Sequence, residues 1–197
     1  YLIYGNVLKN NTYPLSVSAE RIVQAIEIIK YAKSIGANAI AHGSTGAGND
    51  QVRFDLIFQV MDPEIQIISP IRDLQLTRED EIKYLKENGV NLSWEKAQYS
   101  INQGLWGTSV GGKETLTSNK NLPESAYPSQ VNKKTTEEVV LEFQKGELVG
   151  INGKIDSPVN NILKLQKQAK IFGIGRDTHV GDTIIGIKGR VGFEAAA

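Results

Sequence analysis

A glycine-rich turn between a short apolar stretch and a segment with helical spacing constrains this chain more than any other feature. Residues 42–55 read His-Gly-Ser-Thr-Gly-Ala-Gly-Asn-Asp-Gln-Val-Arg-Phe-Asp. The turn contains three glycines, Gly43, Gly46 and Gly48. Glycine can take positive φ and lets a ligand approach the backbone. Asn49 or Asp50 would start a helix, and its free N–H groups and positive dipole end attract an anion. The segment is therefore typical of a ligand-binding turn.

Helices and strands alternate on both sides of this turn. Apolar residues at three- and four-residue spacings predict helices, and short apolar runs between them predict buried strands. In chain order the sequence predicts a helix over 16–36, a strand over 37–41, a helix over 52–60, a strand over 65–68 and a helix over 77–89. A proline ends the second helix, and a capping box begins the third. Such alternation indicates an α/β fold with a parallel sheet covered by helices.

Beyond about residue 90 the pattern changes. Residues 99–134 are rich in Gly, Ser, Asn, Thr and Lys and show little periodicity, so we expect a long functional or mobile loop region there. Further elements are predicted as a hairpin of strands 138–143 and 147–151, a helix that Ser157 and Pro158 begin, and a strand over 183–188. We therefore expect two domains, or pieces of domains, over residues 1–95 and 96–197.

The composition excludes several classes of function. Twenty-two basic residues balance twenty-two acidic ones, so the net charge gives no reason to expect a nucleic-acid partner or an anionic membrane surface. The sequence contains no apolar run near about 18 residues and no signal peptide, so we expect a soluble, cytoplasmic protein without a membrane partner. Because cysteine is absent and the two histidines are far apart, we also expect no metal site.

Polar residues within and after the glycine turn suit a carboxylate or zwitterionic ligand. Thr45, Asn49, Asp50 and Arg53 bring together a hydroxyl, an amide, a carboxylate and a guanidinium. Asn49 and Arg53 are four residues apart and share one helical face, so an amide lies beside an anion-binding fork. In the alternative interpretation, Asn49 or Asp50 only caps the helix and Arg53 is a solvated surface charge. The glycine spacing matches neither the dinucleotide-binding pattern nor a P-loop.

Taken as a whole, residues 42–55 closely resemble the signature of the argininosuccinate synthase family. The two departures are Ala47, where the family usually has lysine, and Asp55, where it has glutamate. Further segments similar to family motifs lie at residues 99–109, 173–176, 186–190 and 193–194. These matches occur in the right order over most of the chain.

The resemblance implies part of a parallel-sheet adenine-nucleotide-binding domain of the PP-loop type, followed by part of an α+β synthetase domain. It implies a ligase of arginine biosynthesis that uses ATP and Mg²⁺ to join citrulline to aspartate, releasing AMP and pyrophosphate. In the family, the citrulline ureido oxygen attacks the α-phosphate of ATP, and the aspartate amine then attacks the citrullyl-adenylate. The full-length enzyme would be a homotetramer.

Site residues follow from the same resemblance, position by position. Gly43 would lie against ATP, and Thr45, Asn49 and Asp50 would bind aspartate. The residues that would hold citrulline are Asn49, Arg53, Ser100 and Ser109. No residue is assigned a covalent or acid–base catalytic role.

Some family features are missing. The adenylating loop Ser-Gly-Gly-Leu-Asp-Thr-Ser and the C-terminal part that helps to build the oligomer do not occur in these 197 residues. We therefore expect a fragment that does not form argininosuccinate by itself. Ala47 also removes a cation near the phosphates.

Two further departures concern the acceptor. Gly181 stands where the family has glutamate, with Asp182 as a candidate replacement, and Phe193 stands where it has tyrosine. The stretch 5–14 also lacks the family's Tyr, Thr/Ser and Arg pattern before proline. Loss of an acid and a phenol removes two candidate partners for a ligand ammonium group. These departures favour a citrulline with a blocked α-amine as an alternative acceptor.

Two other classes of function stay open as alternatives. One is a nucleotide- or amino-acid-binding module without chemistry, and the other is a different adenylating PP-loop enzyme, such as a tRNA-thiolating one. The absence of cysteine and the neutral charge argue against the second. His42, at a strand end, is interpreted as a packed or hydrogen-bonded structural residue rather than an ATP contact.

Overall fold

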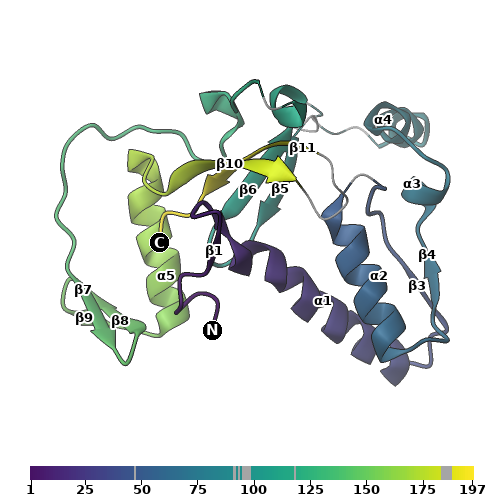
Figure 1. The fold of residues 1–197 in the computed structure, drawn as a ribbon, viewed down its shortest axis with the longest axis horizontal. Coiled ribbons are helices and arrows are strands. Elements are labelled where there is room, and N and C mark those ends of the chain that lie inside the picture. Colours follow the sequence, from purple (N-terminus) through teal and green to yellow (C-terminus); the bar gives the residue numbers. More distant parts are fainter. Residues whose placement is uncertain (47, 91, 93, 95–98, 118, 183–187) are drawn as a thin grey trace. The chain divides into compact units, whose positions relative to one another are not determined.

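The computed structural model describes residues 1–46, 48–90, 92, 94, 99–117, 119–182 and 188–197 (Figure 1). The chain divides into two compact units. The first unit comprises residues 1–17, 99–181 and 188–197, and the second comprises residues 18–98 and 182–187. The predicted domain boundary at residues 95–96 lies outside the described residues.

The second unit holds the glycine turn and alternates helices with strands as predicted. Its elements are α1 (Leu15–Ser34, which begins in the first unit), β3 (Ala39–Ala41), α2 (Asn49–Met61), β4 (Gln66–Ile68), α3 (Pro70–Asp73) and α4 (Arg78–Glu87). Strands β3 and β4 pair in parallel, with Ile40 opposite Ile67. This pairing confirms the predicted parallel sheet.

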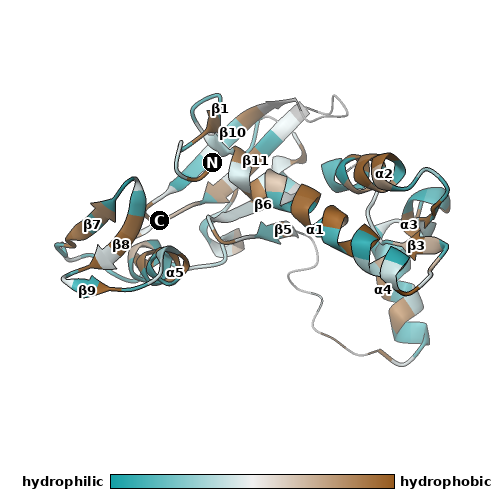
Figure 2. Ribbon diagram, turned by 90° about the horizontal axis from the view of Figure 1, so that it is seen from below, coloured by the Kyte–Doolittle hydropathy of each residue, from teal (hydrophilic) through white to brown (hydrophobic). Residues whose placement is uncertain are grey.

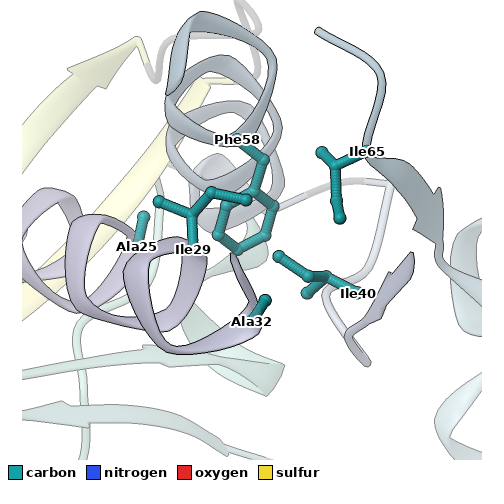
Figure 3. Packing of buried hydrophobic residues seen from close by; sticks show 6 residues of the cluster. All are labelled: Ala25, Ile29, Ala32, Ile40, Phe58 and Ile65. Carbon is teal, nitrogen blue, oxygen red and sulfur yellow. The ribbon is translucent and has the colours of Figure 1, made fainter. Parts of the chain in front are cut away.

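The core of this unit forms where α1 and α2 meet β3. Its buried members are Ala25, Ile29, Ala32, Ile40, Phe58 and Ile65 (Figure 3). Phe58 is only 1% exposed, and its ring stacks on that of Phe54 with centroids 5.9 Å apart. The spacing of four and three residues along α1 places its core residues on one face, and polar residues recur between the apolar ones (Figure 2).

The capping box at the start of α4 is confirmed. The Thr77 hydroxyl accepts a hydrogen bond from the Asp80 backbone N–H at 3.2 Å, and the Asp80 carboxylate accepts one from the Thr77 N–H at 2.9 Å. The Thr77 hydroxyl also donates to this carboxylate at 2.6 Å. The two bonds that the charged carboxylate accepts, from the Thr77 hydroxyl and from its backbone N–H, lower the pKa of Asp80.

The first unit contains a four-stranded sheet with the order β10-β11-β6-β5. Its strands are β5 (Tyr99–Gln103), β6 (Thr108–Gly112), β10 (Arg176–Asp182) and β11 (Lys188–Glu194), and the N-terminal strands β1 (Leu8–Lys9) and β2 (Tyr13–Pro14) pair with each other. A second sheet consists of β7 (Leu141–Gln144), β8 (Glu147–Ile151) and β9 (Lys154–Ile155). The helices are α5 (Pro158–Ala169) and the short 3-10 helices η1 (Lys113–Leu116), η2 (Glu124–Ala126) and η3 (Lys170–Phe172).

The expectation of a long loop over residues 99–134 is wrong for its first part, which forms β5 and β6. Thr108, Ser109 and Val110 are all buried, so β6 is covered on both faces and shows no alternation of polar and apolar residues. The predicted hairpin is confirmed, with positive φ at Lys145 and Gly146 in its turn. Of the strand predicted over 183–188, residues 183–187 lie outside the described residues.

Helix α5 begins as predicted, with Ser157 as N-cap and proline at the first helical position. In the described parts of the chain, no helix combines the length and apolar character that crossing a bilayer requires.

A partly exposed carboxylate before α5 predicts a specific pH dependence. Asp156 accepts hydrogen bonds from Lys164 Nζ at 2.6 Å, from Asn160 Nδ2 at 2.8 Å and from the Ser157 N–H at 2.7 Å. Led by Lys164, these donors lower the pKa of Asp156 to about 2. Because the unfolded carboxyl titrates near about 3.9, its stabilisation is complete above that pH and is lost between about pH 4 and 2.

We expect Asp156→Asn to lower the melting temperature at pH 7 and to have only a small effect at pH 2. Thermal unfolding across this range measures the difference, with the exposed Glu138→Gln as control. A constant difference between wild type and Asp156→Asn at all pH values would contradict the assignment.

Candidate functional site

The glycine turn connects β3 to α2 as the sequence predicts. His42, directly after β3, donates its backbone N–H to the carbonyl of Ile68 at 3.0 Å, which continues the β3–β4 pairing into the turn. At the other end, the Gly48 N–H donates to the Thr45 carbonyl at 3.1 Å, and α2 begins at Asn49.

The glycines of this turn do not adopt the positive φ that we expected from the sequence. None of Gly43, Gly46 and Gly48 has positive φ, and Gly48 has φ −88° and ψ 150°. A Cβ at Gly48 would lie 3.3 Å from Thr45 Oγ1, which is a tight contact, so small size rather than positive φ accounts for glycine there. Gly48 caps α2 without a side-chain hydrogen bond, because glycine has no side chain to supply one. Ala47 lies outside the described residues.

Asp50 lies between two guanidinium groups. Its Oδ1 is 2.8 Å from Arg53 Nη1, and its Oδ2 is 3.4 Å from Arg21 Nε. Both arginine side chains are only 14% exposed. Arg53 is therefore not a solvated surface charge, and Gly48 rather than Asn49 or Asp50 occupies the cap position. The alternative interpretation of this motif as a simple helix start does not fit.

Arg21 is a residue of this site that the sequence did not point to. It lies on α1, 29 positions before its partner Asp50. A charged residue on the polar face of an amphipathic helix is usually solvated, so no local pattern distinguished Arg21 from its neighbours. Only the packing of α1 beside α2 brings its guanidinium to Asp50.

His42 is confirmed as a hydrogen-bonded structural residue. Its Nε2 lies 2.9 Å from Asp55 Oδ1, and its side chain is 11% exposed. Asp55 occupies the position at which the family signature has glutamate.

The first unit brings two further predicted residues together. In the antiparallel pair of β5 and β6, Asn102 lies opposite Ser109 and Ser100 lies opposite Gly111. Because residues opposite each other or two apart share a face, Ser100 and Ser109 lie on the same face of this sheet. Ser109 is 8% exposed, and Ser100 is exposed at the edge strand.

Aromatic residues cover the sheet beside Ser109. Phe193 on β11 lies opposite Ser109 and is 1% exposed. The ring of Tyr13 lies 4.7 Å from the ring of Phe193 and 5.6 Å from that of His179. Burial and the nearby charge of Lys9 lower the pKa of His179. Gly181 lies on β10, and the surroundings of Asp182 are not described.

Two family models together match nearly the whole chain. Residues 1–91 match the model described as Arginosuccinate synthase N-terminal HUP domain, and residues 99–197 match Arginosuccinate synthase C-terminal domain. The chain belongs to the argininosuccinate synthase family. Its membership confirms the predicted fold class, an α/β nucleotide-binding type of domain followed by a second domain.

Relatives named argininosuccinate synthase extend this finding. The protein from Methanocaldococcus jannaschii is 42% identical over 185 residues, which cover 92% of this chain and 47% of the relative. The protein from Sulfolobus acidocaldarius is 38% identical over 200 residues, which cover 100% of this chain and 51% of the relative. The chain thus spans about half the length of the curated relatives it matches.

Proposed function

We propose that the protein containing this chain is a carbon–nitrogen ligase of arginine biosynthesis that condenses citrulline with aspartate at the expense of ATP. One observation carries the proposal: in a chain of this family, Asp50 and Arg53 form a partly buried charge pair at the start of α2, where Gly48 leaves the helix without a side-chain cap. We further propose domains over residues 1–95 and 96–197, and a cytoplasmic homotetramer.

The chemistry of the proposed ligands matches these groups. An aspartate ammonium group would replace an arginine as partner of the Asp50 carboxylate, with Thr45 and Asn49 as hydrogen-bonding neighbours. Among the described residues, Asp50 is the partner of the Arg53 guanidinium through Nη1, so its other N–H groups can receive the carboxylate of citrulline. Ser100 and Ser109 would supply hydroxyl groups to the same ligand, and Gly43 would lie against ATP.

The proposed reaction has two steps. The ureido oxygen of citrulline attacks the α-phosphorus of ATP, which forms a new P–O bond and releases pyrophosphate. The aspartate amine then attacks the ureido carbon, loses a proton and expels AMP. Neither step needs a covalent enzyme intermediate, so the residues of the chain act by orienting the substrates and by donating hydrogen bonds to developing charge.

Mg²⁺ would enter this reaction bound to the phosphates of ATP. Within the described parts of the chain, no group of three or more His, Cys, Asp or Glu side chains is placed to hold a metal ion. Mg²⁺ commonly binds through substrate phosphates and retains several waters, so MgATP is the form of the substrate that fits this chain.

The sheet beside Ser109 favours a finer proposal for the acceptor. The buried ring of Phe193 supplies no hydroxyl, and Gly181 supplies no carboxylate. A free α-ammonium group would therefore lose two of the partners that the family pattern provides, whereas an acylated amine needs neither. We propose an N-acylated citrulline as the acceptor.

The complete protein tests both levels of the proposal. Over multiple turnovers, pyrophosphate release and formation of argininosuccinate, or of its N-acyl form from an acylated acceptor, should require ATP, aspartate and an acceptor. The kcat/KM should be higher for N-acetylcitrulline than for citrulline. A preference for free citrulline would contradict only the finer proposal. Binding of ATP and aspartate without turnover would instead support a non-catalytic binding module.

The 197-residue chain alone tests whether it carries the activity. We expect no pyrophosphate release above background from ATP, citrulline and aspartate. Substrate-dependent release by this chain would show that the adenylating loop of the family is dispensable.

A further inference from the structure

The side chain of His42 is held by two hydrogen bonds that define which ring nitrogen carries the proton. Its Nδ1 lies 3.2 Å from the backbone nitrogen of Ser44, which has an N–H to donate. Nδ1 therefore accepts, and the proton of a neutral imidazole lies on Nε2. Nε2 in turn donates to Asp55 Oδ1 at 2.9 Å. One imidazole thus connects the backbone of the glycine turn to a carboxylate on α2.

A second path leads from the same carboxylate back to the turn. The other oxygen of Asp55 accepts a hydrogen bond from Arg72 Nη1. This nitrogen also lies 3.3 Å from Gln51 Oε1, and Gln51 Nε2 donates to the carbonyl of Gly46 at 2.5 Å. The contacts therefore form a continuous path from Ser44 to Gly46 through four side chains.

The two ends of this path flank Thr45. Ser44 is held by its N–H through His42, and its carbonyl lies 3.4 Å from the hydroxyl of Ser69, which is fully buried. Gly46 is held by its carbonyl through Gln51. The backbone on each side of Thr45 is thus tied to neighbouring elements, while Thr45 itself remains exposed to a ligand.

We infer that His42, Gln51, Asp55 and Arg72 form a positioning network that presents Thr45 to the amino-acid substrate aspartate. This inference rests on the proposed function and assigns these residues a role that the family signature alone does not give. None of the four is a catalytic residue. They act by fixing the backbone of the turn before the substrate arrives, which preserves the orientation that the second step needs.

The network uses both oxygens of the carboxylate at position 55. Asp55 has two oxygens, one for a neutral imidazole N–H and one for a guanidinium, and an asparagine could satisfy only one of these donors. The network holds the residues on both sides of Thr45, but not Gly43. His42 is fixed to Ile68 by its own backbone N–H, so Gly43 is held from the β3 side independently of the imidazole.

A matched pair of substitutions tests the two contacts of His42 in the complete protein. Asparagine places an oxygen close to the position of Nδ1 and lacks the donor at Nε2, whereas glutamine can place a donor near Nε2 and lacks the acceptor at Nδ1. We expect both His42→Asn and His42→Gln, and likewise Asp55→Ala, to raise the KM for aspartate about 10- to 100-fold. We expect acceptor-dependent ATP–pyrophosphate exchange, which does not use aspartate, to change by less than about threefold.

Two further variants distinguish positioning from folding. Asp55→Glu keeps both acceptor oxygens and should restore much of the aspartate KM that Asp55→Ala loses. Asp73→Asn removes a carboxylate that lies 3.2 Å from Arg72 Nε but outside the network, and should leave the KM unchanged. Circular dichroism and thermal unfolding of every variant show whether it is folded.

The outcomes separate this inference from the proposed function. A wild-type protein without ligase activity would contradict the proposed function. An active wild type whose His42 and Asp55 variants keep the aspartate KM within about twofold would overturn the inference, as would a pyrophosphate exchange that falls by the same factor as the aspartate reaction.

Discussion

Arg53→Lys in the complete protein will lower kcat/KM for the citrulline acceptor by about 100-fold. Lysine keeps the positive charge but replaces a planar fork of five donors by a compact ammonium group, so it cannot bind a substrate carboxylate in bidentate geometry while it holds Asp50. Hydrogen bonds between charged groups contribute about 1.5–3 kcal/mol, and the loss of one such bond in the transition state corresponds to roughly 10- to 100-fold. Disturbing Asp50 as well brings the expected effect to the upper end of this range.

Steady-state kinetics with varied acceptor measure this effect. Arg78→Lys is the matched control, because Arg78 is exposed at the start of α4 and takes no part in the site. Arg53→Ala should lower kcat/KM further than Arg53→Lys, since it leaves Asp50 without its nearest cation. Equal activity of wild type and Arg53→Lys would mean that only charge is required at position 53, and would remove Arg53 as the carboxylate-binding residue.

The second unit was the more predictable part of the fold. Its helices are amphipathic, so the spacing of residues such as Ala25, Ile29 and Ala32 is enough to predict the buried face. The Thr77 cap and the glycine turn mark helix starts by local chemistry, which depends on few residues and little on tertiary context. The order of the elements therefore followed from the sequence, except for the four-residue helix α3, which it did not predict.

The first unit was less predictable because its central strand is buried on both faces. Thr108, Ser109 and Val110 are small or β-branched and show no period of two, and the glycines around them resemble a loop. The strand β6 is defined by its partners β5 and β11, which are distant in sequence. Pairings of this kind depend on tertiary structure and leave little local pattern.

In the site, local sequence patterns connect the residues that we propose to face the ligands, but not the groups that hold those residues. Asp50 and Arg53 stand three apart on one helix, and a local pattern suffices to connect them. Arg21 and Arg72 reach α2 from other elements, so only the packed structure shows that they surround it. The prediction of positive φ for the turn glycines was wrong for a related reason. Whether a position needs glycine for its backbone conformation or for its small side chain depends on neighbouring atoms, which the sequence does not show.

Gly175→Ala will strongly destabilise the first unit. Gly175 has φ +74°, a conformation that costs an L-residue about 1–2 kcal/mol. A Cβ there would also run into the backbone of Ala195 and lie 2.7 Å from the nitrogen of Ala196. The carbonyl of Gly175 accepts the Ala195 N–H at 2.9 Å, so relief of the clash would break this bond at the end of β11. We expect a loss of roughly 4 kcal/mol or more, or failure to fold.

Gly153→Ala separates the two causes of this loss. Gly153 has nearly the same φ, +75°, but no atom lies within 4 Å of its added Cβ. Its substitution should therefore cost only the backbone strain, about 1–2 kcal/mol. Urea unfolding of the complete protein, followed by tryptophan fluorescence, compares the midpoints of the two variants. Similar midpoints would mean that the segment after β11 moves aside at little cost. A much lower midpoint for Gly175→Ala would show that the close approach of Ala195, rather than φ alone, requires glycine in the Gly-Ile-Gly-Arg segment.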